Sequence, residues 1–173
     1  MSAKNTKLTA YVDGAARGNP GPAAAGVVVD DAAGKELKIL SVALGHQSNN
    51  TAEYCALILA LQEALMMGAK ELQVYTDSEL VVKQFNGEYK IKEPSLKALF
   101  SLVSHLKGGF KSLKVTHVSR EKNKRADAEA NRALVLFLVL GAVFFWTSVW
   151  LLFSRAALKL QLRIERLNLL KAE

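Results

Sequence analysis

The stretch that decides the fold is Tyr11-Val12-Asp13-Gly14-Ala15-Ala16-Arg17-Gly18-Asn19-Pro20-Gly21-Pro22. An apolar, β-prone run leads up to Asp13, a segment rich in glycine and proline follows it, and a second apolar run begins at Val27. This pattern predicts a strand, a tight loop and a second strand, with Asp13 at the end of the first strand. An aspartate in that place either caps the turn or binds a ligand, because aspartate is common in turns.

Hydrophobic spacing predicts the elements that follow. Glu36–Leu44 reads as a third strand, which completes an antiparallel meander. Apolar residues at helical spacing predict a helix over Thr51–Met67, with Asn50 as its N-cap and Glu53 completing a capping box. Later elements are a strand over Leu72–Thr76, helices over Ser78–Phe85 and Pro94–Leu106, a strand over Leu113–Val118 and a helix from Asn123. This order predicts a mixed α/β fold, in which a five-stranded sheet of three antiparallel strands and then β/α units is flanked by helices.

Length, charge and cysteine content set limits on the class of protein. The 173 residues suffice for one domain with a real core, and the formal net charge of +7 is compatible with a polyanionic partner. The single cysteine, Cys55, rules out an intrachain disulfide. The segment Met1–Lys7 is short and polar, which is unlike a signal peptide, so a cytoplasmic location is expected for the part that follows.

Four acidic residues stand out by their positions. Asp13 and Asp77 end predicted strands, whereas Glu53 and Asp127 lie in the first turns of predicted helices. Strand ends and helix starts often meet at one edge of a sheet, where binding sites form. Carboxylates from several elements, without a cluster of His and Cys, suit Mg²⁺ or Mn²⁺. From spacing alone, the other reading is that each acid caps a separate turn or helix.

Four segments of the chain resemble, in the same order, the signature motifs of the type 1 ribonucleases H (ribonuclease HI). They are Tyr11–Pro22, Asn49–Tyr54, Tyr75–Ser78 and Asn123–Asp127, and the resemblance covers about residues 6–134. The resemblance implies the ribonuclease H fold and an endonuclease that cuts the RNA strand of RNA/DNA hybrids. A non-catalytic module of this fold, which binds nucleic acid or a membrane partner, is the alternative.

The resemblance also implies a mechanism. Asp13, Glu53, Asp77 and Asp127 match the family's metal-binding tetrad, which holds two Mg²⁺ ions about 4 Å apart, with Mn²⁺ as a substitute. Asp13 would bridge both ions, of which one activates the attacking water and the other stabilises the leaving 3′-oxygen. The products would carry 5′-phosphate and 3′-hydroxyl ends.

Contacts to the hybrid follow from the same resemblance. Positions that match readers of RNA 2′-hydroxyls are Gly14, Ala15, Ala16, Arg17, Asn19, Asn49 and Asn50. Ser48 matches a DNA-phosphate contact, and Glu79 stands where many members place a glutamine that contacts base or sugar. His117 falls where members place a histidine that assists proton transfer and product release, although a structural strand histidine is the competing interpretation. The segment between Phe85 and Leu96 is too short for the family's basic protrusion, so hybrid binding should be weak and salt-sensitive.

The end of the chain departs from the compact family pattern. Residues 133–154 contain no charge, and as a helix these 22 residues would span about 33 Å, the thickness of a bilayer's hydrocarbon core. Arg132 and Arg155 bracket the run. The sequence therefore predicts a ribonuclease H domain over residues 1–134, a single transmembrane helix over 135–154 and a basic, Leu-rich amphipathic tail over 155–173. A buried helix or a dimer interface is the alternative for the apolar run.

Overall fold

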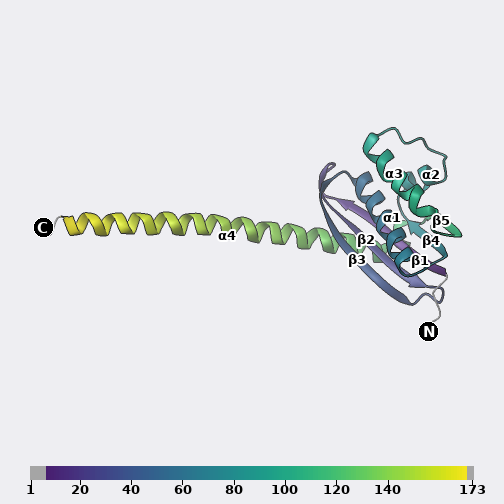
Figure 1. Cartoon of the computed structure of the whole chain (residues 1–173), viewed down its shortest axis with the longest axis horizontal. Helices are drawn as coiled ribbons and strands as arrows, with labels where there is room; N and C mark the ends of the chain where they lie inside the picture. Colours follow the sequence, from purple (N-terminus) through teal and green to yellow (C-terminus); the bar gives the residue numbers. More distant parts are fainter. Residues whose placement is uncertain (1–6, 171–173) are drawn as a thin grey trace. The chain divides into compact units, whose positions relative to one another are not determined.

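A computed structural model describes residues 7–170 of the chain, with side chains described from residue 7 to residue 151. It divides into two compact units, Met1–Val135 and Leu136–Glu173. The first unit holds the sheet and the helices that pack on it (Figure 1).

The first unit is built on one five-stranded sheet with strand order β3-β2-β1-β4-β5. β1, β2 and β3 pair antiparallel, whereas β4 pairs parallel with both β1 and β5. The predicted mixed sheet of a meander followed by β/α units is thereby confirmed. The element bounds are β1 Lys7–Ala16, β2 Gly21–Asp31, β3 Glu36–Gln47, α1 Asn49–Met66, β4 Glu71–Thr76, α2 Glu79–Phe85, α3 Pro94–Lys107, β5 Ser112–His117, the 3₁₀ turn η1 Arg120–Lys122 and α4 Lys124–Leu170.

The first hairpin differs from the sequence prediction. β1 does not end at Asp13 but continues to Ala16, and Asp13 lies opposite Gly26 in the middle of the β1–β2 ladder. The predicted loop over Gly14–Pro22 is therefore wrong, and only residues 17–20 form the turn. The physical reason is that Gly14 and its two alanine neighbours pair with equally small residues of β2, so neither bulk nor conformation interrupts the ladder.

The start of α1 also differs from the prediction. Ser48, not Asn50, is the N-cap, and its Oγ accepts a hydrogen bond from the backbone N–H of Thr51 at 3.2 Å. Asn50 lies inside the first turn, and Glu53 turns toward the sheet, where its Oε2 accepts the backbone N–H of Gly14 at 3.2 Å. Because Glu53 is engaged with β1, the predicted capping box is not formed.

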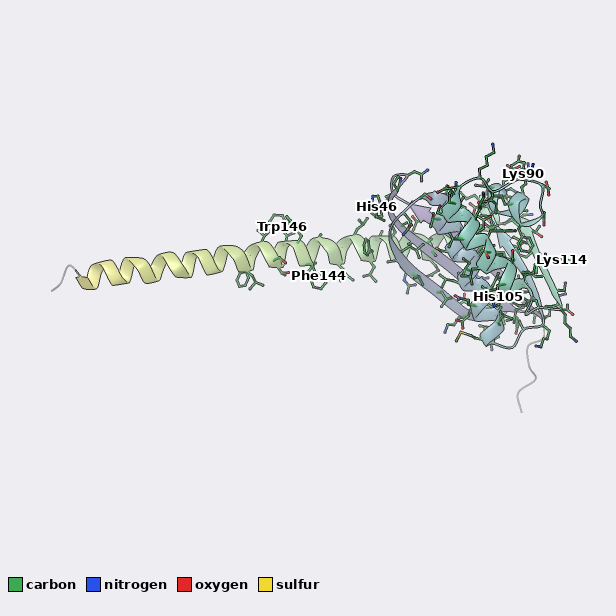
Figure 2. The ribbon with its side chains drawn as sticks, turned by 45° about the horizontal axis from the view of Figure 1, so that its top comes forward. His46, Lys90, His105, Lys114, Phe144 and Trp146 are labelled. Atoms are coloured by element: carbon green, nitrogen blue, oxygen red, sulfur yellow. The ribbon has the colours of Figure 1, made fainter. Side chains whose placement is uncertain are left out.

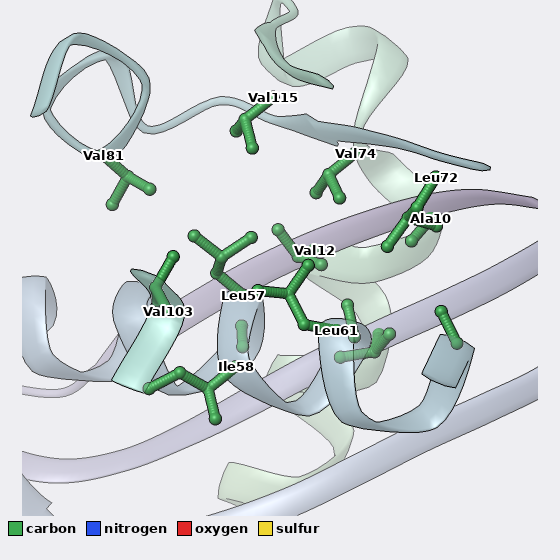
Figure 3. Packing of buried hydrophobic residues seen from close by; sticks show 14 of the residues in the cluster. Ala10, Val12, Leu57, Ile58, Leu61, Leu72, Val74, Val81, Val103 and Val115 are labelled. Atoms are coloured by element: carbon green, nitrogen blue, oxygen red, sulfur yellow. The ribbon is translucent and has the colours of Figure 1, made fainter. Parts of the chain in front are cut away.

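The main core lies between α1 and one face of the sheet. Alternate residues of β1 point to this face, and Leu57 and Leu61 of α1 pack against Ala10, Val12 and the neighbouring strands (Figure 3). Helices α2 and α3 close the core on the same side, through Val81 and Val103 (Figure 3). The core thus fixes α1 against β1, the two elements that carry Glu53 and Asp13.

The opposite face of the sheet is covered by the beginning of α4. A Cβ on Gly26 would lie 2.2 Å from the backbone oxygen of Ala126, so the helix can approach β2 this closely only because residue 26 is glycine. Arg125 clamps the same turn of α4 to the meander, with bonds of 2.7 Å to Asp30 and 2.9 Å to Glu36. These contacts place the turn that carries Asp127.

The second unit consists of the later part of α4. Among the described residues, one helix segment, Lys124–Leu151, is long and apolar enough to cross a membrane by length and composition, with a mean hydropathy of 2.3. Most of its large apolar side chains between residues 136 and 151 are exposed, and Figure 2 shows Phe144 and Trp146 projecting outward from the helix. Phe144 is 71% exposed and Trp146 69%.

Candidate active site

Three of the four acids singled out in the sequence converge in the structure. Carboxylate oxygens of Asp13, Glu53 and Asp77 all lie within 4.8 Å of one another. Asp13 and Glu53 are buried, and Asp77 is half-buried. None of the ion pairs found among the described residues involves these three side chains.

Each acid is delivered by a different element. Asp13 lies within β1, Asp77 directly follows β4, and Glu53 faces β1 from the second turn of α1. Gly14 allows this meeting, because a Cβ there would lie 2.1 Å from the backbone nitrogen of Glu53. The helix backbone therefore rests directly on the strand, and Glu53 reaches Asp13.

Burial and the closeness of the acids shift the pKa values of Asp13 and Glu53. Burial raises the pKa of Asp13 to about 7, and the neighbouring charges of Asp77 and Asp127 add to the effect. Burial, followed by the charges of Asp13 and Asp77, also raises the pKa of Glu53, against the opposing hydrogen bond from Gly14. The cluster is therefore strained electrostatically unless a cation offsets it.

Asp127 belongs to the same hollow but is held by other partners. Its Oδ1 accepts a bond of 2.8 Å from the Arg120 guanidinium, and its Oδ2 accepts one of 3.1 Å from the Asn131 amide. Asp127 nevertheless acts on the cluster, because its charge contributes to the raised pKa of Asp13. The structure thus brings the carboxylates of three acids within 4.8 Å of one another, and the fourth acid, Asp127, lines the same hollow while paired with Arg120.

The hollow that contains the four acids measures about 360 Å³. Five of the residues predicted to contact 2′-hydroxyls line it. Four belong to the first hairpin, namely Gly14, Ala15, Ala16 and Arg17, and the fifth is Asn49 of α1. Asn19 lies beside them, because its Oδ1 accepts the backbone N–H of Asn49 at 3.1 Å. Ser48 and Asn50 belong to the start of α1, where Ser48 caps the helix.

Two predicted residues lie apart from the acids. His117 ends β5 as an exposed side chain and does not line the hollow. Glu79 is also exposed, and its carboxylate pairs with Lys83 at 2.6 Å. The Lys83 hydrogen bond and charge lower the pKa of Glu79, and the charge of His117 adds a smaller effect of the same sign.

Two residues of the site were not singled out for a role from the sequence. Asn131 holds Asp127, and the buried amide of Asn123 donates to Asp77 Oδ1 at 2.9 Å. Asn123 opens one of the four recognised segments, but its sequence position indicated only a helix start. Asn131 follows Asp127 by four residues, which is the spacing of side chains that meet on a helix, and this signal was available.

The donor set fits a hard divalent cation. It consists of carboxylate oxygens only, within a distance that one ion can span, and the raised pKa of two of the acids shows negative charge in need of compensation. Carboxylate oxygens are ligands that suit Mg²⁺ and Mn²⁺.

Comparison with known proteins identifies relatives of the first unit. Residues 11–133 match the family described as "Reverse transcriptase-like". Ribonuclease HI of Halobacterium salinarum is 42% identical over 128 residues, which cover 74% of this chain and 64% of that protein. The bifunctional protein Rv2228c of Mycobacterium tuberculosis is 40% identical over 129 residues, which cover 74% of this chain and 35% of that protein. The chain thus spans less than two thirds of the length of these relatives.

Solved structures give a closer match in length. The RNase H1 of Halobacterium salinarum superposes with a TM-score of 0.72 at 42% identity, covering 74% of this chain and 97% of the solved one. LC11-RNase H1, solved in complex with an RNA/DNA hybrid, gives a TM-score of 0.72 at 46% identity, covering 76% of this chain and 99% of the solved one. The resemblance found in the four sequence segments is confirmed by these matches, and the chain belongs to the type 1 ribonuclease H family.

Proposed function

We propose that this chain is an endonuclease that hydrolyses the RNA strand of RNA/DNA hybrids. The observation that carries the proposal is the meeting of Asp13, Glu53 and Asp77 in a hollow that the first hairpin and the start of α1 also line. A site for divalent metal thereby adjoins a surface of backbone amides and an asparagine, which can read 2′-hydroxyl groups. The hybrid bound by LC11-RNase H1 belongs to that relative and supports the same substrate class here.

The four acids would hold two Mg²⁺ or Mn²⁺ ions, with Asp13 shared between them. Such ions supply an activated water and stabilisation of the leaving 3′-oxygen, which gives 5′-phosphate and 3′-hydroxyl ends. Glu53 is kept on β1 by the Gly14 N–H, so it reaches the cluster without rearrangement. Asp127 must share or leave Arg120 to act as a ligand, which frees a guanidinium to contact a phosphate of the RNA strand.

The remaining contacts follow the family pattern. Arg17, Asn19, Asn49 and Asn50 would contact the minor groove of the hybrid, with Ser48 at a DNA phosphate and Glu79 at a base or sugar. His117 would assist proton transfer and product release. His117 ends β5 as an exposed side chain outside the hollow, so this role requires that the bound hybrid or the end of β5 bring His117 toward the scissile phosphate.

The test is a cleavage assay with the full chain in mild detergent. A labelled RNA/DNA hybrid is incubated with Mg²⁺ or with EDTA, beside single-stranded RNA, double-stranded RNA and duplex DNA. We expect metal-dependent cutting of the hybrid's RNA strand alone, and loss of cutting with retained hybrid binding in Asp13→Asn. A folded chain that binds the hybrid and never cuts it in Mg²⁺ or Mn²⁺ would favour the non-catalytic binding module instead.

We further propose that residues 135–154 cross a membrane as a single helix. The support is that most of the described apolar side chains of this run, up to Leu151, are exposed, whereas a helix buried in a soluble domain would hide its apolar stripe and show a polar one. Residues 1–134 would then form a cytoplasmic catalytic domain, where hybrids and free Mg²⁺ are found, and residues 155–173 would form a basic tail beyond the span.

Membrane attachment is tested by flotation with phosphatidylcholine vesicles after a wash at high pH. The full chain should float, and Val139→Lys combined with Val143→Lys should leave it in the soluble fraction, because two charges in the span oppose insertion. Met66→Lys is the matched control, since Met66 is an apolar residue of the first unit that is 81% exposed. A wild-type chain that stays soluble without detergent would contradict the proposal.

A further inference from the structure

The side-chain amide of Asn123 lies between β1, which carries Asp13, and Asp77, which directly follows β4. Asn123 lies between η1 and α4 and is fully buried. Its Nδ2 donates two hydrogen bonds of 2.9 Å, one to the backbone oxygen of Val12 and one to Asp77 Oδ1. Both partners are acceptors, so the nitrogen and not the oxygen must face them.

The two strands no longer pair with each other at this point. The parallel ladder between β1 and β4 ends at the pair Tyr11–Tyr75, two residues before each aspartate. Beyond that pair the Asn123 amide bridges the strands, through the carbonyl that immediately precedes Asp13 and through the Asp77 side chain itself. A side chain from the η1–α4 junction thus connects the two strands where their backbone ladder has ended.

Asn123 also contacts the element of the fourth acid. Its backbone oxygen accepts the N–H of Asp127 at 3.1 Å, in the first turn of α4. A single residue thus touches Asp77 directly, Asp13 through its neighbour, and Asp127 through the backbone.

The other end of the Asn123 amide has no such partner. Within residues 7–151, whose side chains the structure describes, its Oδ1 is a buried polar atom with no hydrogen-bond partner. Leaving a buried acceptor unpaired is unfavourable, and an apolar residue of similar size would avoid that cost. The amide therefore serves the two acceptors that its nitrogen contacts, the Val12 carbonyl and Asp77 Oδ1, which indicates a role in the site and not only in the core.

We propose that Asn123 is a positioning residue that holds the metal-binding carboxylates in the geometry the ion requires. The inference rests on the proposed function for the identity of the site, but it concerns metal binding and not cleavage. Residues that orient metal ligands typically contribute a factor of about 10 to 100 in metal affinity. Asn123→Ala should therefore weaken Mn²⁺ and Mg²⁺ binding by about 10- to 100-fold, because Asp77 can then rotate away from Asp13.

The experiment measures metal affinity in the full chain, in detergent and without nucleic acid, by calorimetric titration with MnCl₂ and MgCl₂. Gln84→Ala is the matched control: Gln84 is another buried amide, bonded to the Tyr54 hydroxyl at 2.8 Å, and it lies outside the acidic hollow. Both variants should lose thermal stability, but only Asn123→Ala should lose metal affinity. In the cleavage assay Asn123→Ala should need more Mg²⁺ for half-maximal rate, with the KM for hybrid unchanged at saturating metal.

A second measurement needs no variant, in case Asn123→Ala does not fold. The side-chain amide resonances of Asn123 in the wild-type chain should shift at the Mg²⁺ concentrations that shift the backbone amides of Asp13 and Asp77. Unchanged amide resonances at saturating Mg²⁺, or wild-type metal affinity in Asn123→Ala, would overturn the inference. A wild-type chain whose Mn²⁺ affinity depends on Asn123 but which never cuts a hybrid would contradict the proposed function and leave this inference standing.

Discussion

Replacing Asp13 by asparagine should stabilise the metal-free protein while abolishing its activity. Asp13 is 5% exposed and shares its surroundings with Asp77 and Asp127, which together with burial raise its pKa from 3.8 to about 7. Above pH 7 the folded protein must carry this charge against its surroundings. A difference of about 3 pKa units corresponds to about 4 kcal/mol of free energy of unfolding lost at high pH.

The sign of the pH dependence follows from which state binds more protons. Because the folded-state pKa of Asp13 is raised, the folded protein keeps a proton between about pH 4 and pH 7 that the unfolded chain has released. The free energy of unfolding without metal therefore falls as the pH rises through this window. Asp13→Asn has no such group and should show a shallower decline, with the raised pKa of Glu53 still contributing to what remains.

The assay is chemical unfolding of residues 1–135, followed by circular dichroism at pH 5 and pH 8, in EDTA and in Mg²⁺. The fragment is suitable because 74% of the present residues are enough to cover 97% of the solved RNase H1 chain from Halobacterium salinarum. At pH 8 in EDTA, Asp13→Asn should be more stable than wild type by about 2–4 kcal/mol, which is the charge penalty less some lost packing. Mg²⁺ should stabilise the wild type but not Asp13→Asn.

Glu88→Gln serves as the control for a carboxylate-to-amide change, because Glu88 is exposed and does not line the acidic hollow. It should behave like wild type in all four conditions. The reasoning is refuted if Asp13→Asn is less stable than wild type at pH 8 in EDTA, since the cluster would then carry no electrostatic strain.

Three further outcomes follow from the structure. Gly14→Ala should lose about 3 kcal/mol of stability, measured by denaturant unfolding, together with most cleavage, because the added Cβ would meet the Glu53 backbone nitrogen at 2.1 Å; an unaffected variant would contradict the close contact. Arg125→Ala should cost about 3 kcal/mol by the same measurement, because Asp30 is 4% exposed and would keep an unpaired charge, and adding Asp30→Asn should recover part of the loss. Hybrid affinity, measured by fluorescence anisotropy, should fall roughly 100-fold between 50 and 200 mM salt if about four phosphates are neutralised, whereas a flat salt dependence would show that phosphate contacts contribute little.

The sequence predicted strands well where apolar and polar residues alternate, and it predicted helices well where apolar residues recur at helical spacing. The helix over Thr51–Met67 and the order of the elements match the structure, because periodic burial leaves a periodic pattern. The error over Gly14–Pro22 has the opposite origin. Glycine marks a turn and also marks a place where another backbone comes very close, and only the tertiary structure shows that Gly14 does the second.

The acids of the site were predicted by position, but their supports were not. Asp13, Glu53 and Asp77 meet as the recognised segments implied. The contacts of Asp127 with Arg120 and of Asp77 with Asn123 join elements that are far apart or irregular, so no local pattern announces them. The cap at Ser48 was missed for a simpler reason: Ser48, Asn49 and Asn50 are three consecutive cap-forming residues, and propensity does not choose among them.

Two glycines explain why the acids gather around Asp13. Gly26 lies opposite Asp13 on β2 and therefore shares its face of the sheet, where the missing side chain lets α4 approach with Asp127. Gly14 follows Asp13 on β1 and points to the other face, where its missing side chain lets α1 approach with Glu53. One helix thus closes on the strands from each side at the level of one aspartate. The site depends on backbone contacts that only glycine permits, so the loop-like composition around Asp13 is a requirement for assembling the carboxylates and not for turning the chain.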